Sequence, residues 1–149
     1  MSEKEIAEIL FSKDTKEIYE KFKVLELICD GSDELYSYFD IYLEAIHSKN
    51  ACVRGRGFKL ISRNAKWDGE NKINHNLAEI LAVLDDEKST VVRQCLSVVN
   101  HIGKYKKELI PAIKEKLIQI NYLQYKESMQ GLIIKDIQRV LHSLEEYET

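Results

Sequence analysis

The sequence predicts an all-α protein built from stacked helical hairpins. Val53-Arg54 returns as Val92-Arg93 after 39 residues, and each copy lies between two apolar patterns with helical spacing. A period of this size is typical of a stacked array of helix pairs, in which each unit buries its apolar face against its neighbours. One proline and six glycines are few for 149 residues, which favours long helices over short strands.

The first half of the chain contains four predicted helices. Residues 2–5 and 14–17 read as capping boxes, and Gly31 is a natural helix end. The expected starts are Ser2, Asp14, Ser32 or Asp33, and Asn50. The apolar stripe of the third helix is Leu35, Phe39, Tyr42 or Leu43, and Ile46. The fourth helix runs toward Trp67.

The second half contains four more. Residues 68–71 form a turn, and the fifth helix follows with Leu77, Ile80, Leu81 and Leu84 as its stripe. After a polar loop at 85–88, Ser89 caps a sixth helix that ends before Gly103. Pro111 fits the first turn of the seventh, where a missing N–H costs nothing. The eighth runs from about Lys126 into the 140s.

The eight helices pair into four hairpins of one domain, residues 1–149, with bounds of roughly 2–30, 32–67, 71–103 and 107–145. Apolar pairs, a short polar loop holding Asp or Asn, and Val-Arg before a small residue resemble the HEAT repeat, well over 36–103 and partly over 104–144. The resemblance implies an α-α superhelix of the HEAT/armadillo type. It also implies that Val53 and Val92 pack within a unit, and that Arg54 and Arg93 hydrogen-bond to neighbouring units.

More narrowly, five stretches resemble a group of small bacterial HEAT-like proteins of unassigned function: 11–14, 56–58, 65–68, 84–88 and 92–96. Some of that group carry a label taken from the iron–sulfur assembly proteins Suf B and Suf D. A cluster scaffold needs converging thiolate or imidazole ligands. The three cysteines here are far apart in the sequence: Cys29, Cys52 and Cys95. They read as buried small hydrophobes, with a disulfide or metal role as the alternative, and no cofactor is expected.

Charge is unevenly distributed along the chain. The net charge is −3, but residues 1–50 carry six Lys/Arg against twelve Asp/Glu, and residues 51–149 carry sixteen against thirteen. The surface should therefore have regions of both signs. The sequence has no apolar run of about 18 residues, and its first residues lack the pattern of a signal peptide. We expect a cytoplasmic protein without a membrane span.

No catalytic constellation is visible. The four histidines, at 47, 75, 101 and 142, do not pair at helical spacing with cysteine or with each other, and no phosphate-binding glycine loop occurs. Arg54-Gly55-Arg56-Gly57 is read as close helix packing or as a nucleic-acid tract. Asp85-Asp86-Glu87 is read as a solvated loop or as a cation site. Trp67 either closes the end of the fourth helix over the core or forms an exposed anchor for a partner. We expect a non-enzyme.

The main functional prediction is a surface. In a stacked array the second helices of successive units line one side. In this chain the positions of those helices outside the apolar stripe are rich in basic and polar residues. The candidate binding face consists of Arg56, Lys59, Arg63, Trp67, Ser97, Asn100, His101, Lys135 and Arg139. It is either a solvated face or a ridge that attracts phosphates or an acidic protein segment. The preferred function is a protein-interaction scaffold with an unknown protein partner, and the oligomeric state is left open.

Nucleic-acid binding is the alternative. The most specific version of this alternative is an enzyme that resembles the alkylpurine DNA glycosylases, which are built from HEAT-like repeats. Its candidate site residues in this chain are Trp67, Asp68, Arg63 and Arg93. The chain has a single tryptophan and a net charge of −3, which weigh against this form.

Overall fold

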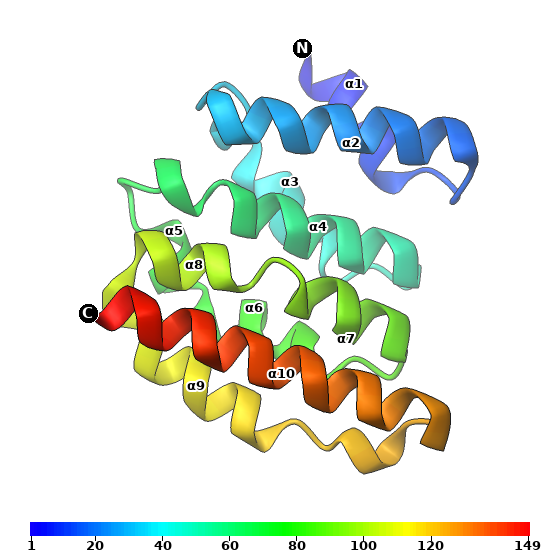
Figure 1. Ribbon diagram of the computed structural model, residues 1–149. Coiled ribbons are helices and arrows are strands. Elements are labelled where there is room, and N and C mark those ends of the chain that lie inside the picture. The colour runs from blue at the N-terminus through cyan, green and yellow to red at the C-terminus, as the bar shows by residue number, and fades with distance from the viewer.

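The computed structural model describes residues 1–149, which form helices and turns without any β-strand, so the all-α prediction is confirmed. The helices lie in two layers (Figure 1). One layer contains α1 (Glu3–Phe11), α3 (Phe39–Ala45), α5 (Lys72–His75), α6 (Leu77–Leu81) and α9 (Ile110–Gln119). The other, the second-helix layer, contains α2 (Lys16–Gly31), α4 (Ala51–Arg63), α7 (Ser89–Leu96), α8 (Asn100–Tyr105) and α10 (Glu127–Glu148). Short 3-10 turns span Tyr36–Tyr38, Ala65–Trp67, Ala82–Asp85, Lys107–Leu109 and Tyr122–Gln124.

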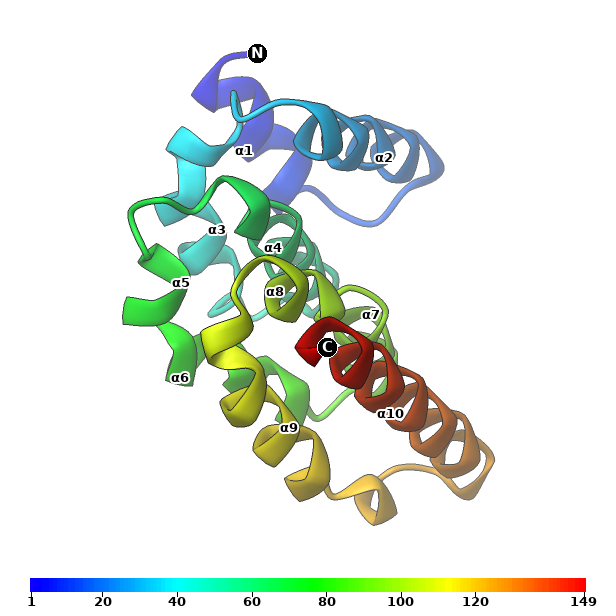
Figure 2. The same cartoon turned by 60° about the vertical axis from the view of Figure 1, so that its left-hand side comes forward.

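The second-helix layer is curved. Figure 2 shows α2 and α10 projecting beyond α4 and α8, so the outer side of this layer is concave. The N-terminus lies beside α1 at one end of the stack, and the C-terminus ends α10 near the other (Figure 1). Between the layers, 37 buried apolar residues form one continuous cluster. No helix combines the length and apolar character needed to cross a bilayer.

N-cap side chains bind the first turn of α1, α2 and α4, whereas the predicted cap Ser89 is instead the first residue of α7, whose N-cap Lys88 makes no side-chain hydrogen bond. Ser2 caps α1 by accepting the Glu5 N–H at 3.2 Å, and Asn50 caps α4 by accepting the Cys52 N–H at 2.9 Å, as predicted. At α2 the predicted cap was wrong by one residue: Thr15, not Asp14, accepts the Ile18 N–H at 3.2 Å. Pro111 lies in the first turn of α9, where it removes no helical hydrogen bond.

Three predicted helices differ from the observed ones. The third is shorter, because a 3-10 turn precedes α3. The fifth is broken into α5, α6 and a 3-10 turn: the Asn76 amide donates to the Lys72 carbonyl at 2.8 Å and closes α5. The sixth bends between α7 and α8, where the Ser97 hydroxyl donates to the Gln94 carbonyl at 2.6 Å. Such side-chain bonds to local carbonyls compete with a regular helix.

The repeated Val-Arg pair has the structural roles predicted for it. Val53 and Val92 are buried. Arg54 Nε donates to Asp86 Oδ2 at 2.6 Å, and Arg93 Nε donates to Asp136 Oδ2 at 2.7 Å. Each arginine thus binds an aspartate in the next hairpin along the chain. Because hydrogen bonds to charged groups are stronger than neutral ones, these pairs tie neighbouring hairpins together.

Gly57 allows the close approach of α4 to α3. A Cβ added there would lie 2.8 Å from the Ala45 Cβ and 2.9 Å from the Tyr42 carbonyl oxygen. Any larger residue would force the two helices apart.

Candidate functional site

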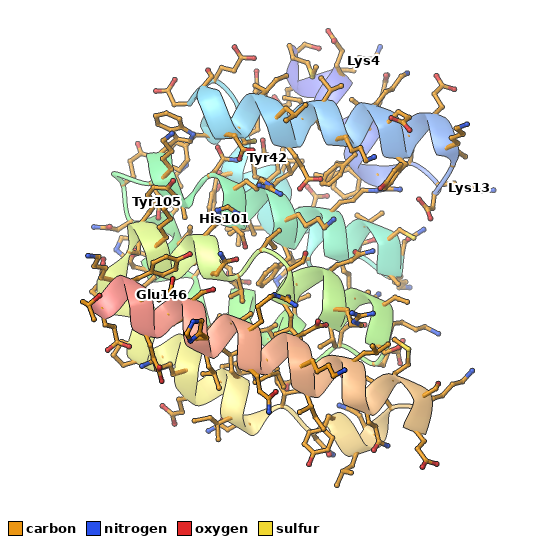
Figure 3. The ribbon with its side chains drawn as sticks, viewed as in Figure 1. Lys4, Lys13, Tyr42, His101, Tyr105 and Glu146 are labelled. Carbon is orange, nitrogen blue, oxygen red and sulfur yellow. The ribbon has the colours of Figure 1, made fainter.

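The nine predicted face residues come from three parts of the second-helix layer. The first part is α4 with the turn that follows it, which carry Arg56, Lys59, Arg63 and Trp67. The second is α8 with the bend before it, which carry Ser97, Asn100 and His101. The third is α10, which carries Lys135 and Arg139. Figure 3 shows His101 on the concave side of this layer, between α4 and α10. Ser97, Lys135 and Arg139 are exposed, and all the others except Arg56 are half-buried.

Arg56 is buried, so it is not the accessible basic residue of the face that the sequence predicts. Its side chain is 7 % exposed, and its Nη1 donates to the carbonyls of Leu10 at 3.1 Å and Ser12 at 2.7 Å. The carbonyls at the end of a helix have no partner within it, so a guanidinium is well suited to bind them. Arg56 therefore fastens the end of α1 to α4.

Trp67 also has a structural role. It is half-buried, and its indole Nε1 donates to the Cys29 carbonyl at 2.8 Å near the end of α2. Lys66 stacks over the ring, with its Nζ 4.8 Å from the ring centroid. These contacts support a structural role for Trp67, but the helix end that it binds is that of α2 rather than that of the predicted fourth helix.

Carboxylates of α2 neutralise one part of the predicted basic ridge. Arg63 Nε donates to Glu26 at 2.8 Å, and its Nη1 donates to Asp30 at 3.3 Å. Burial favours a lower pKa for Arg63, but these hydrogen bonds outweigh it and raise the pKa. Burial, followed by the nearby Arg63 charge, lowers the pKa of His101, whose Nε2 lies 3.5 Å from Arg63 Nη1. This region therefore carries no surplus of positive charge.

A second charged cluster lies between α7 and α10. Asp136, with a side chain 6 % exposed, accepts from Arg93 Nε at 2.7 Å and from Arg139 Nη1 at 3.1 Å. Burial favours a raised pKa for Asp136, but the hydrogen bonds from the two arginines outweigh it and lower the pKa. The cluster, which we call the Arg–Asp–Arg cluster, combines two cations with one ionised carboxylate.

A hollow of about 650 Å³ lies over this cluster. Its remaining lining is Thr90, Gln94, Ser97 and Met129. Gln94 also lines a smaller hollow of about 110 Å³ among α2, α4 and α7, whose charged lining consists of Lys23, Arg56 and Lys59 with Asp14 and Glu26. The two hollows share Gln94 as a lining residue, and we call them together the polar groove of the second-helix face. Neither Asp136 nor Arg93 was among the predicted face residues, although the repeated Val-Arg pair already marked Arg93.

Each of the nominated glycosylase residues is engaged in a structural contact. Asp68 is completely buried and paired with Lys106, Arg93 binds Asp136, Arg63 binds α2, and Trp67 binds Cys29. Asp68 therefore has no open side toward which a water or a base could approach.

Few groups on this chain are placed for covalent or metal chemistry. Burial raises the pKa of the Cys29 thiol to about 12 and that of Cys95 well above its ordinary value, which makes both poor nucleophiles. No group of three or more His, Cys, Asp or Glu side chains is arranged to hold a metal ion. The chain matches no family model, and no curated protein or solved structure shows significant similarity to it.

Proposed function

We propose that this chain is a single HEAT-like α-α superhelix that acts as a non-enzymatic protein-interaction scaffold in the cytoplasm. The proposal for the fold is supported by the equivalent Arg54–Asp86 and Arg93–Asp136 bonds between successive hairpins. The curved second-helix layer, with its first helices behind, also fits this architecture (Figure 2).

The polar groove on the concave face is the observation that carries the proposed function. It runs over side chains from α2, α4, α7 and α10, so a ligand there would contact all four hairpins. Polar and positively charged groups predominate over apolar ones in its lining. Extended concave surfaces of this kind are used by helical repeat proteins to bind other proteins.

The test is affinity capture with a charge-reversed groove. The face variant is Lys59→Glu/Arg139→Glu, and the matched control is Lys4→Glu/Lys107→Glu, which makes the same charge change at two exposed lysines outside the second-helix layer. Circular dichroism first establishes that both variants are folded. We expect the wild type and the control to enrich the same proteins and the face variant to lose them.

Equal enrichment by all three proteins would refute binding through this face. Recovery of RNA or DNA in place of a protein, lost in the face variant, would instead support the nucleic-acid alternative.

A further inference from the structure

The Arg–Asp–Arg cluster has hydrogen-bond donors that the protein does not use. Arg93 donates to Asp136 through Nε and Nη2, and Arg139 donates to it through Nη1. Arg93 Nη1 and Arg139 Nε and Nη2 have no acceptor within the chain. Two guanidinium groups share one carboxylate, so one positive charge at this point is not compensated.

The hollow over the cluster is lined by groups that suit an anion. Thr90 contributes a hydroxyl and Gln94 an amide, and neither side chain has a hydrogen-bond partner within the chain. Ser97 adds a second hydroxyl. Asp136 is the only acidic residue in the lining, and both of its oxygens already accept hydrogen bonds. Guanidinium groups bind carboxylates and phosphates in a forked geometry, so the ligand chemistry is an oxygen anion.

The groove continues toward a second positive position. Lys59 has no acidic partner, and Lys23 lies over the Tyr19 ring, with its Nζ 4.4 Å from the ring centroid. Gln94 lines both hollows and joins this position to the Arg–Asp–Arg cluster. A ligand with acidic groups some distance apart would therefore meet one cationic position on α7 and α10 and another on α2 and α4.

The distribution of acids favours a peptide over a nucleic acid. Glu26 and Asp30 lie on the same face beside Arg63. Glu26 also lines the smaller hollow, as does Asp14, which lies 3.5 Å from Arg56. A nucleic acid carries a charge on every phosphate and would be repelled by these carboxylates along part of its path. A peptide can place neutral residues there and acidic residues only at the two cationic positions.

We propose that the Arg–Asp–Arg cluster is a carboxylate-binding subsite that anchors an acidic peptide segment of the partner protein, with Lys59 and Lys23 contacting a second acidic residue. The proposal rests on the proposed scaffold function and names the chemistry of its ligand. Asp136 holds both guanidinium groups in place, and the unused donors of Arg93 and Arg139 bind the carboxylate.

The experiment measures the fluorescence anisotropy of a fluorescein-labelled dodecapeptide of alternating Glu and Ala, with the full chain as titrant. The matched peptide has Gln in place of Glu. Arg139→Gln removes a donor of the subsite at an exposed position. Lys135→Gln removes the same charge one helical turn away, at a residue of the predicted face that lines neither hollow and is therefore not part of the proposed subsite.

We expect binding of the Glu peptide to weaken about tenfold in Arg139→Gln and to change less than about twofold in Lys135→Gln. Lys59→Gln should weaken it by a smaller factor. The Gln peptide should bind no variant measurably, and oligo-dT of similar length should compete poorly with the Glu peptide.

Equal losses in Arg139→Gln and Lys135→Gln would overturn the subsite, because they would show diffuse attraction by net charge. Stronger binding of oligo-dT than of the Glu peptide would overturn the choice of an acidic peptide. If these peptide results fail while the capture of partner proteins still depends on the groove, the subsite is refuted and the scaffold function stands. If peptide binding depends on Arg139 but no protein is captured, the scaffold function is the part that fails.

Discussion

Asp68 is the buried carboxylate whose removal should destabilise the fold most clearly. Its side chain has no exposed surface, and it accepts from Tyr36 Oη at 2.5 Å and from the backbone N–H groups of Lys72 and Ile73 at 2.9 Å each. Lys106 Nζ, on a side chain only 6 % exposed, lies 3.2 Å from Asp68 Oδ2 and also donates to Asn71. Four donors from three separate segments thus converge on one carboxylate.

The two partners should not be equally sensitive. Asp68→Asn leaves the Lys106 ammonium buried with only the Asn71 amide oxygen as a partner, and turns an N–H₂ group toward other donors. Breaking a buried ion pair in this way costs about 3 to 5 kcal/mol. Lys106→Met removes the charge that is hard to bury and leaves the Asp68 carboxylate with three hydrogen bonds, so we expect a loss of about 1 to 2 kcal/mol.

Urea unfolding at pH 7, followed by circular dichroism, measures these losses. Once Met replaces Lys106, Asp68→Asn no longer strands an ammonium group, so its added cost should fall by about 1 to 3 kcal/mol. The reasoning is refuted if Lys106→Met is as costly as Asp68→Asn, or if the two losses simply add in the double variant. Either result would mean that the ion pair does not determine the stability of this region.

Three further predictions concern packing, pH and thiol chemistry. Gly57→Ala should lower the free energy of unfolding by about 1 to 3 kcal/mol because its methyl group would overlap α3; Gly131→Ala, in open space on α10, should raise it by about 0.5 to 1 kcal/mol in the same urea experiment. The pKa of His101 is lowered in the folded chain, so the unfolded chain binds more protons and stability should fall as the pH drops below about 6.5. The groups that act on His101 are Arg63, Asp30, Lys104 and Glu26. Urea midpoints at pH 7.5 and 5.5 should therefore differ more for the wild type than for His101→Gln, and equal differences would contradict this. Ellman's reagent should titrate one thiol, the half-buried Cys52, in the native chain and all three thiols in urea, because the other two are buried; rapid native reaction of more than one thiol would contradict the burial argument.

The fold class was predictable because its signals are local. Helix caps such as Ser2 and Asn50 act within three residues, and the apolar stripes follow the period of the helix. The helix breaks were harder, because Asn76 and Ser97 bond to carbonyls in their own turn and nothing in the apolar pattern records that. The Val-Arg repeat was the most informative long-range signal, since both arginines bind the next hairpin.

The candidate binding face was only partly predictable, because its charges are decided by partners far away in the sequence. Arg63 pairs with Glu26, which is 37 residues away in the sequence. Arg56 hydrogen-bonds to backbone carbonyls, which every residue has and which the sequence therefore cannot identify as partners. Subtracting the apolar stripe from a helix identifies residues that do not face the core, but it does not show which of them are already paired. The excess of acids in residues 1–50 was the available sign that α2 would oppose the basic side chains of α4.

The pairing of these charges makes the two sides of the concave face electrostatically different. At the α2 side, Glu26 and Asp30 compensate Arg63, and Asp14 and Glu26 line the smaller hollow together with its three cations, so little positive charge there is uncompensated. Toward α10 one carboxylate faces two guanidinium groups, and a surplus remains. In the proposed complex, an acidic segment therefore gains most by placing its carboxylates between α7 and α10. A segment bound in the opposite direction would place its carboxylates beside Glu26 and Asp30 and lose that attraction. The ion pairs of Arg63 with Glu26 and Asp30 would therefore also select the direction in which the segment binds.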